Sequence, residues 1–148
     1  MDRELWDDDE ALWRDRAIVG GGSSVAIPTL DGVFGTLVTA DELRAARALS
    51  QLTDPHRFGT ELGLSYLPRR HPKFDPDAYW RGPAWPQLNY LAYVAANRRA
   101  SDTVAAEIAR LSKAGAAVSG LAEFWNPLTG AGRGAIPQGW GALAAVYP

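Results

Sequence analysis

The sequence predicts an all-α chain whose helices are joined by long loops rich in aromatic residues, proline and glycine. Several segments carry apolar residues at helical spacing, whereas alternating runs of β-branched residues, the usual mark of strands, are nearly absent. The stretch from Thr53 to Pro83 holds turn signals without any long periodic segment. Long connections of this kind inside a compact domain are uncommon and tend to be functional. We therefore expect a helical scaffold with a site built on its loops.

Each expected helix has its own local signals. Thr39 followed by Glu42 forms a capping box, with apolar residues at helical spacing behind it. Pro86 is tolerated in a first helical turn, and Ser101 beside Asp102 is a typical cap. The expected helices are 39–52, 85–98, 102–119 and 138–147.

The chain before Thr39 gives weaker signals. Trp6 and Trp13 stand among acidic residues, which favours either a short helix or a turn with aromatic anchors. The glycine-rich run VGGGSS, Val19 to Ser24, lacks the Gly-Lys-Ser/Thr of a phosphate-binding loop. We interpret it as a flexible loop.

Composition excludes several classes of protein. A chain of 148 residues, 47% hydrophobic, suits one domain or a piece of one. A net charge of −2 offers no basic field to nucleic acid, and the absence of cysteine excludes disulfides and thiolate metal sites. His56 and His71 stand apart, as surface or turn residues would, so neither a metal nor a cofactor is implied.

No apolar run is long enough for a membrane span, and the acidic start is unlike a signal peptide. These features favour a cytoplasmic protein.

The segment FDPDAYWRGPAWPQLNY, Phe74 to Tyr90, concentrates aromatic side chains in one of the long connections. Prolines, an arginine and an asparagine are interleaved with the rings, which is unusual for a hydrophobic core. A surface that binds a flat, hydroxylated ligand would use this mixture. The segment is therefore the first candidate for a binding site.

Glu123 is the carboxylate of a second aromatic loop, GLAEFWNPLTGAGRGAIPQGW. Phe124 and Trp125 follow it directly, before an Asn-Pro turn and a glycine-rich stretch. Two interpretations remain open at this point. Glu123 is either a solvated acid or a partner of Arg133, or it is a general base flanked by rings that stack on a sugar.

Both segments resemble motifs of the mannosyl-oligosaccharide glucosidase family of glycoside hydrolases and its bacterial relatives, among them the mannosylglycerate hydrolases. The first resembles the family's Tyr-Trp-Arg-Gly-Pro-x-Trp-Pro-x-x-Asn-Tyr, and EFWNPLTGAG resembles its Glu-Tyr-Tyr-Asn/Asp-Pro-x-Thr-Gly-x-Gly. A softer likeness covers LTDPHRFGTELGLSYLPRRHPKF upstream. The matching positions of the first motif are Tyr79, Trp80, Arg81, Gly82, Pro83, Trp85, Pro86, Asn89 and Tyr90.

The resemblance implies a trehalase-like (α/α)6 toroid that hydrolyses an α-glycosidic bond with inversion, on a carbohydrate substrate and without a cofactor. Glu123 stands where the family carries its catalytic base. Arg81 would donate a fork of hydrogen bonds to sugar hydroxyls, and tryptophan faces would stack on the pyranose. The implied substrate-binding residues are Tyr79, Trp80, Arg81, Trp85, Asn89, Trp125 and Trp140.

The chain departs from the family pattern in one respect. The family's general acid is an aspartate of an earlier motif, and nothing like that motif lies between Met1 and Phe74. The expected helices are also too few for a toroid. We therefore expect residues 1–148 to be the C-terminal portion of one catalytic domain, inactive alone, whose partner would be the missing N-terminal part. A truncated gene, a split enzyme and a non-catalytic carbohydrate-binding remnant all remain open.

A partial toroid also leaves helix faces without neighbours. Leu43, Ala46, Val104 and Ile108 are the residues expected to be exposed in this way, and such patches promote association.

Overall fold

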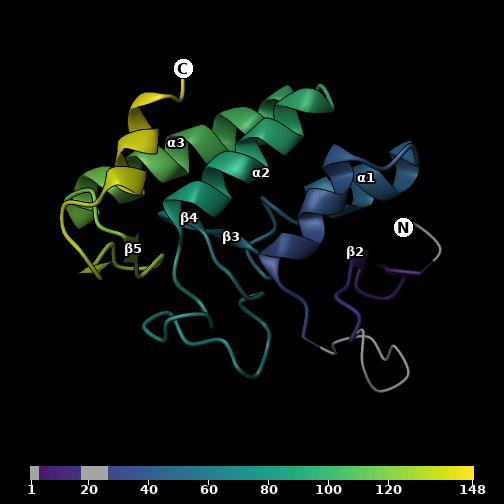
Figure 1. Ribbon diagram of the computed structural model, residues 1–148, viewed down its shortest axis with the longest axis horizontal. Coiled ribbons are helices and arrows are strands. Elements are labelled where there is room, and N and C mark those ends of the chain that lie inside the picture. Colours follow the sequence, from purple (N-terminus) through teal and green to yellow (C-terminus); the bar gives the residue numbers. More distant parts are fainter. Residues whose placement is uncertain (1–3, 18–26) are drawn as a thin grey trace.

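The computed structural model describes residues 4–17 and 27–148, so the glycine-rich run from Val19 to Ser24 lies outside the described residues. The chain is rich in helix (Figure 1). Its elements include the α-helices α1 (Glu42–Ser50), α2 (Pro86–Arg98) and α3 (Asp102–Ser119), and the 3-10 helices η1 (Leu30–Leu37) and η2 (Gly139–Ala145). The first three expected helices are thereby confirmed, with α3 matching its expected bounds.

Helices α2 and α3 form an antiparallel pair that is the centre of the fold (Figure 1). Alanines line their buried faces, including Ala92, Ala95, Ala96 and Ala105. Small side chains let two helix backbones approach closely, and Ile108 of α3 is buried in the same cluster as these alanines. Both η1 and η2 pack on α2, and the loops with the two aromatic motifs lie together at one side of the pair.

Helix α1 begins later than the capping box suggested. Its N-cap is Asp41, whose carboxylate accepts a hydrogen bond from the Arg44 backbone N–H at 3.0 Å. The Thr39 hydroxyl instead accepts from the Asp41 N–H, also at 3.0 Å, and Glu42 binds the Arg99 guanidinium. An aspartate in extended backbone two residues later therefore caps the helix in place of Thr39.

The last expected helix is a 3-10 helix, and η1 was not expected at all. Gln138 caps η2 by accepting from the Trp140 N–H. Gly141 packs so closely that an added Cβ would lie 2.7 Å from the Leu121 carbonyl oxygen. Short segments fixed by such contacts carry too little periodicity to be predicted from spacing.

The described residues also form three antiparallel hairpins of two-residue strands. They pair β1 (Trp6–Asp7) with β2 (Leu12–Trp13), β3 (Gly59–Thr60) with β4 (Gly63–Leu64), and β5 (Phe124–Trp125) with β6 (Gly132–Arg133). The N-terminal segment is thus a tight turn with aromatic anchors, and the helical alternative is wrong. Trp6 and Trp13 meet edge to face at 4.7 Å, and Arg44 and Arg47 of α1 lie over the Trp6 ring.

Asn89 of α2 joins three elements. Its Oδ1 accepts from the Leu64 N–H at 2.8 Å and from the Ser112 hydroxyl at 3.1 Å, while its Nδ2 donates to the Trp85 carbonyl at 2.9 Å. Gly63 approaches with φ of 128°, where an added Cβ would lie 3.1 Å from that Oδ1. A glycine is therefore required beside Asn89.

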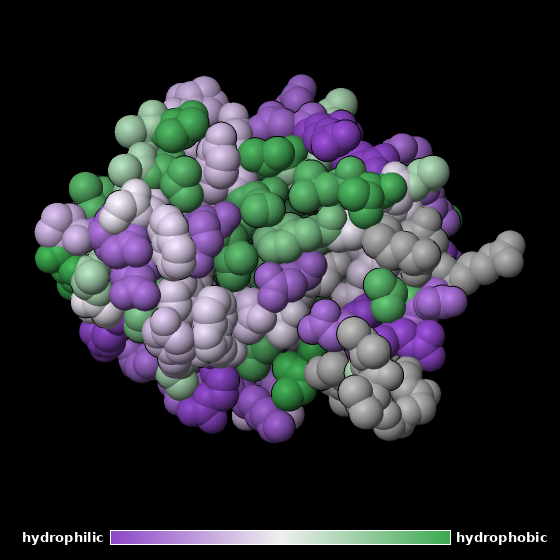
Figure 2. Space-filling model, viewed as in Figure 1, coloured by the Kyte–Doolittle hydropathy of each residue, from purple (hydrophilic) through white to green (hydrophobic). Residues whose placement is uncertain are grey.

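The expected exposure is only partly found. Leu43 of α1 is 72% exposed, and Ala46 is exposed as well. Val104 is half-buried, whereas Ile108 is buried because α2 and β4 pack on that face of α3, so its expected exposure is wrong. Hydrophobic side chains gather on the face over α2 and η1 (Figure 2).

Within the described ranges, no helix combines the length and apolar character that crossing a bilayer requires.

Asn89→Ala would leave the Leu64 N–H and the Ser112 hydroxyl without their acceptor, whereas the Trp85 carbonyl would keep the backbone N–H of residue 89 at 3.0 Å. Since each unsatisfied buried group costs about 1–3 kcal/mol, we expect the free energy of unfolding to fall by roughly 2–4 kcal/mol in urea titrations. Asn97→Ala is the matched control, because Asn97 is an exposed asparagine of the same helix, and a change within about 0.5 kcal/mol is expected. Equal losses in both variants would contradict the role of Asn89.

Candidate active site

The two aromatic motifs, residues 74–90 and 123–132, lie side by side in space. Ala84 and Trp125 form an isolated antiparallel bridge: the Ala84 N–H donates to the Trp125 carbonyl at 2.9 Å, and the Trp125 N–H donates back at 3.1 Å. The residues next to Ala84 in the first motif therefore lie close to the residues next to Trp125 in the second. The expectation that both motifs serve one site is consistent with this pairing.

Three rings stack into a column beside the bridge. Trp80 lies on Trp85 with centroids 4.3 Å apart and planes 14° apart, and Trp85 lies on Phe124 at 4.5 Å and 26°. Trp85 is 1% exposed and Trp80 46% exposed. This aromatic column (Trp80, Trp85 and Phe124) thus runs from the core to the surface and ends in an accessible indole.

Two tyrosines meet the column edge to face. Tyr79 contacts Trp80, Trp85 and Phe124 at centroid distances of 5.5, 5.0 and 5.2 Å, and it is 54% exposed. Tyr66 contacts Trp80 at a centroid distance of 5.0 Å. Edge-to-face pairs place the positive ring edge on a negative ring face. The accessible surface is therefore an aromatic patch made mainly by the exposed residues Tyr79 and Trp80.

Arg81 follows Trp80 and is exposed. Its guanidinium lies 3.3 Å from the Asp75 carboxylate, and its backbone carbonyl accepts from the Asp75 N–H at 3.2 Å. Gly82 permits this turn, since an added Cβ would lie 2.4 Å from the Asp75 carbonyl oxygen. The side-chain contact is long and solvent-exposed, so it leaves the other guanidinium donors available to a ligand.

Glu123 is half-buried and stands directly before β5. Its backbone N–H donates to the Ala135 carbonyl at 2.9 Å, and its Oε2 accepts from the Ala135 N–H at 3.1 Å. Within the described residues Glu123 makes no ion pair, and Arg133 pairs with Asp77 at 2.8 Å instead. The interpretation of Glu123 as the partner of Arg133 is therefore wrong.

Asp77 is a link between the two motifs that sequence reasoning missed. Besides Arg133, it accepts a hydrogen bond from the Asn126 side chain at 3.1 Å. Its only signal in the sequence was its place among the acidic residues just before Tyr79. The site thus has a second cross-connection, on the exposed side of the bridge.

Three of the residues expected to bind substrate have internal contacts. Trp85 and Asn89 are buried as described above. Trp125 is 1% exposed, and its indole N–H donates to the Leu62 carbonyl at 2.6 Å. These three side chains pack inside the protein beneath the site, whereas Tyr79, Trp80 and Arg81 are exposed.

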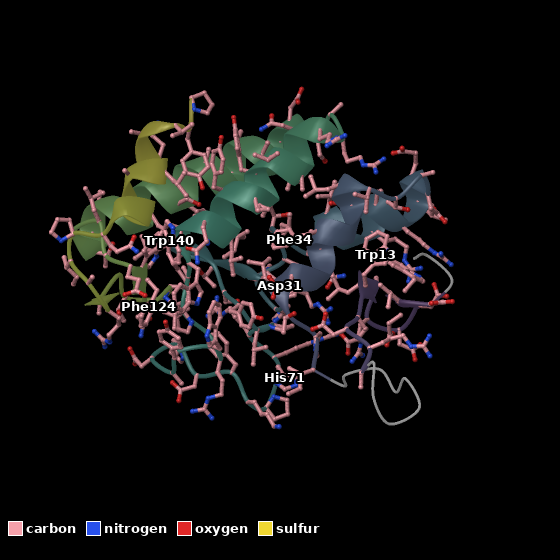
Figure 3. The ribbon with its side chains drawn as sticks, viewed as in Figure 1. Trp13, Asp31, Phe34, His71, Phe124 and Trp140 are labelled. Atoms are coloured by element: carbon pink, nitrogen blue, oxygen red, sulfur yellow. The ribbon has the colours of Figure 1, made fainter. Side chains whose placement is uncertain are left out.

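Trp140 is also accessible, with 44% of its surface exposed. It belongs to η2 and lies at the same end of the molecule as Phe124 (Figure 3).

His56 lies exposed in a turn. His71 lies in the bend before Phe74, where its ring nitrogen accepts from the Lys73 N–H at 3.1 Å. Both match their expected places.

Comparison with known proteins gives consistent matches. The chain is 27% identical to a mannosylglycerate hydrolase of Thermus thermophilus over 145 residues, covering 97% of this chain and 34% of that protein. A glucosylglycerate hydrolase of Mycolicibacterium hassiacum is 33% identical over 105 residues, covering 68% of this chain and 24% of that protein. The chain therefore spans about a third or less of the curated relatives it matches.

Solved structures agree. The GH63 mannosylglycerate hydrolase from Thermus thermophilus in complex with glucose superposes with a TM-score of 0.81 at 26% identity, over 98% of this chain and 36% of that one. The same enzyme in complex with Tris and D-glycerate gives 0.80 at 25% identity, over 98% and 35%. Residues 1–141 match the mannosylglycerate hydrolase MGH1-like glycoside hydrolase domain. The chain belongs to this family of glycoside hydrolases.

Proposed function

We propose that this chain supplies the general base and part of the sugar pocket of a glycoside hydrolase domain that hydrolyses an α-glycosidic bond with inversion. Its helices would form the C-terminal portion of an (α/α)6 toroid. Family membership and the match to GH63 structures support this proposal. The remainder of the domain would supply the general acid.

The observation that carries the proposal is the accessible aromatic patch beside the loop that carries the Glu123 carboxylate. Sugars present flat faces of C–H groups, which pack on aromatic rings, and rims of hydroxyls, which need donors and acceptors. Trp80 offers an exposed indole face, Tyr79 a hydroxyl, and Arg81 a fork of donors. Trp140 would add a second ring. The buried contacts of Trp85, Asn89 and Trp125 would hold these groups in place.

Glu123 would act as the base. In an inverting hydrolase one carboxylate deprotonates water on one face of the sugar, while a carboxylic acid on the other face protonates the leaving oxygen. The Ala135 N–H binds one oxygen of Glu123, which orients the carboxylate. The proton lost by the water would pass to Glu123 as the water oxygen attacks the anomeric carbon.

The substrate class in this proposal is taken from the names of the relatives. Those relatives are hydrolases of mannosylglycerate and glucosylglycerate. By analogy with those relatives, the proposed substrate is a small glycoside or oligosaccharide.

A carbohydrate-binding remnant without hydrolysis is the second candidate. The described residues favour it in one respect: the aromatic patch can bind a sugar without any acid. The two candidates share sugar binding and differ in the need for Glu123.

Glu123→Gln separates the candidates. The variant would be placed in a complete domain in which this chain replaces the matching third of the Thermus thermophilus mannosylglycerate hydrolase. The amide keeps the shape but accepts no proton, so we expect hydrolysis of mannosylglycerate to fall by about 10²–10⁴-fold, with substrate binding retained. Glu61→Gln, an exposed acid paired with Arg69, is the control and should leave the rate unchanged.

Hydrolysis at the parental rate by the Glu123→Gln chimera would exclude Glu123 as the base. Hydrolysis by the isolated 148-residue chain would exclude the need for an acid from elsewhere.

Trp80→Ala tests sugar binding by the isolated chain. Removing the exposed indole should weaken glucose binding, followed by NMR titration, by roughly threefold to tenfold, the scale of one aromatic contact. Leu43→Ala, which shortens a still more exposed apolar side chain on α1 (72% against 46% for Trp80), should have no effect. If both variants bind glucose like the parent, Trp80 is not part of a sugar site.

A further inference from the structure

Trp80 is an exposed ring on a loop, yet it lies nearly parallel to Trp85, with 14° between the planes. Stacking on one face leaves an indole free to slide or tilt. Two rings limit this freedom: Tyr79, which directly precedes Trp80 in the same loop, meets it at 5.5 Å, and Tyr66 meets it at 5.0 Å with 62° between the planes. Tyr66 is the one of the two that ties Trp80 to a more distant part of the chain. The orientation of Trp80 therefore depends on what holds Tyr66.

Tyr66 is held at both ends by the first turn of η1. Its backbone carbonyl accepts from the Leu30 N–H at 2.9 Å, and its hydroxyl donates to Asp31 Oδ2 at 2.7 Å. Asp31 lies at the lower end of η1 (Figure 3). A side chain fixed at its backbone and at its tip has little freedom left in the ring between them.

The chemistry of Tyr66 and Asp31 favours a lasting hydrogen bond between them. Burial and the Asp31 hydrogen bond raise the pKa of Tyr66, so the hydroxyl keeps its proton at neutral pH and remains a donor. Burial, with a smaller contribution from Asp15, also raises the pKa of Asp31. A short hydrogen bond from a hydroxyl to a carboxylate is among the stronger ones in proteins.

We propose that Tyr66, oriented by Asp31, is a positioning residue that holds Trp80 in its stacked place on the aromatic column. Through this pair, η1 sets the accessible face of the column although it contributes no ring to it. The consequence for sugar binding rests on the function proposed above, whereas the positioning itself does not.

The test uses circular dichroism, because two indoles stacked at 4.3 Å couple their transitions and give a paired positive and negative band. Trp80→Phe serves as the reference, since it removes the band pair that comes from Trp80 and Trp85 and leaves the signal of Trp6 and Trp13. Tyr66→Ala should lose most of the Trp80–Trp85 band pair. Tyr66→Phe and Asp31→Ala should each lose part of it, and Asp31→Asn, which still offers an oxygen acceptor, should retain it.

Tyr93→Phe is the matched control: it removes the hydroxyl of a tyrosine whose ring meets Tyr90 and Tyr147 and no tryptophan among the described residues. It should leave the bands unchanged. The proposal is overturned if Tyr66→Phe and Asp31→Ala both give the parental spectrum. It is equally overturned if Asp31→Asn reduces the Trp80–Trp85 band pair as much as Asp31→Ala does. These variants decide the matter even if Tyr66→Ala does not fold.

Glucose binding by the same variants separates the two proposals. If glucose binding weakens in the same variants that lose the Trp80–Trp85 band pair, both the sugar-binding function and the positioning role of Tyr66 are supported. If the coupling falls as expected while the parent chain and all variants fail to bind glucose, Tyr66 positions Trp80 and the sugar-binding function is wrong.

Discussion

Two backbone hydrogen bonds between Ala84 and Trp125 are the constraint on which the site depends. They join a loop that ends at α2 to a loop that begins after α3, so the position of each motif is set by the helix pair. Trp125 is in turn fixed by Leu62 and by Gly115 of α3, where an added Cβ would lie 2.5 Å from the indole nitrogen. A larger residue at 115 would displace Trp125 and, with it, the bridge.

Different interactions hold the two sides of the site. On the buried side, stacking of Trp85 between Trp80 and Phe124 removes large apolar surfaces from water. On the exposed side, Asp77 binds Arg133 and Asn126. Exposed ion pairs contribute little to stability, so this contact sets the spacing of the loops more than it stabilises them. The loop that carries Glu123 and the loop that carries the aromatic patch are therefore joined on both the buried and the exposed side.

Sequence reasoning found the parts of this structure that local spacing encodes. The three α-helices have enough periodic turns to be predicted. The two aromatic motifs stand out by composition, and their resemblance to a family adds the roles expected of them. The 3-10 helices and the hairpins are too short to leave a periodic pattern. The link from Asp31 to Tyr66 joins residues 35 positions apart, and spacing cannot show such a pair. That some of the motif rings would be buried could be expected, but spacing does not tell which ones, since rings of one motif divide between core and surface only after the helices pack. Trp85, Asn89 and Trp125 are on the buried side of that division.

The position of Glu123 is encoded by a neighbouring glycine as much as by the glutamate. Gly134 has φ of 70°, and an added Cβ would lie 2.4 Å from Glu123 Oε2. Any other residue there would be strained and would push the carboxylate away from the Ala135 N–H. A base must face the water that it deprotonates, and small displacements of catalytic groups reduce rates strongly. The glycine-rich stretch after the Asn-Pro turn is therefore part of the proposed catalytic apparatus, because a side chain at residue 134 would occupy the space that the Glu123 carboxylate fills.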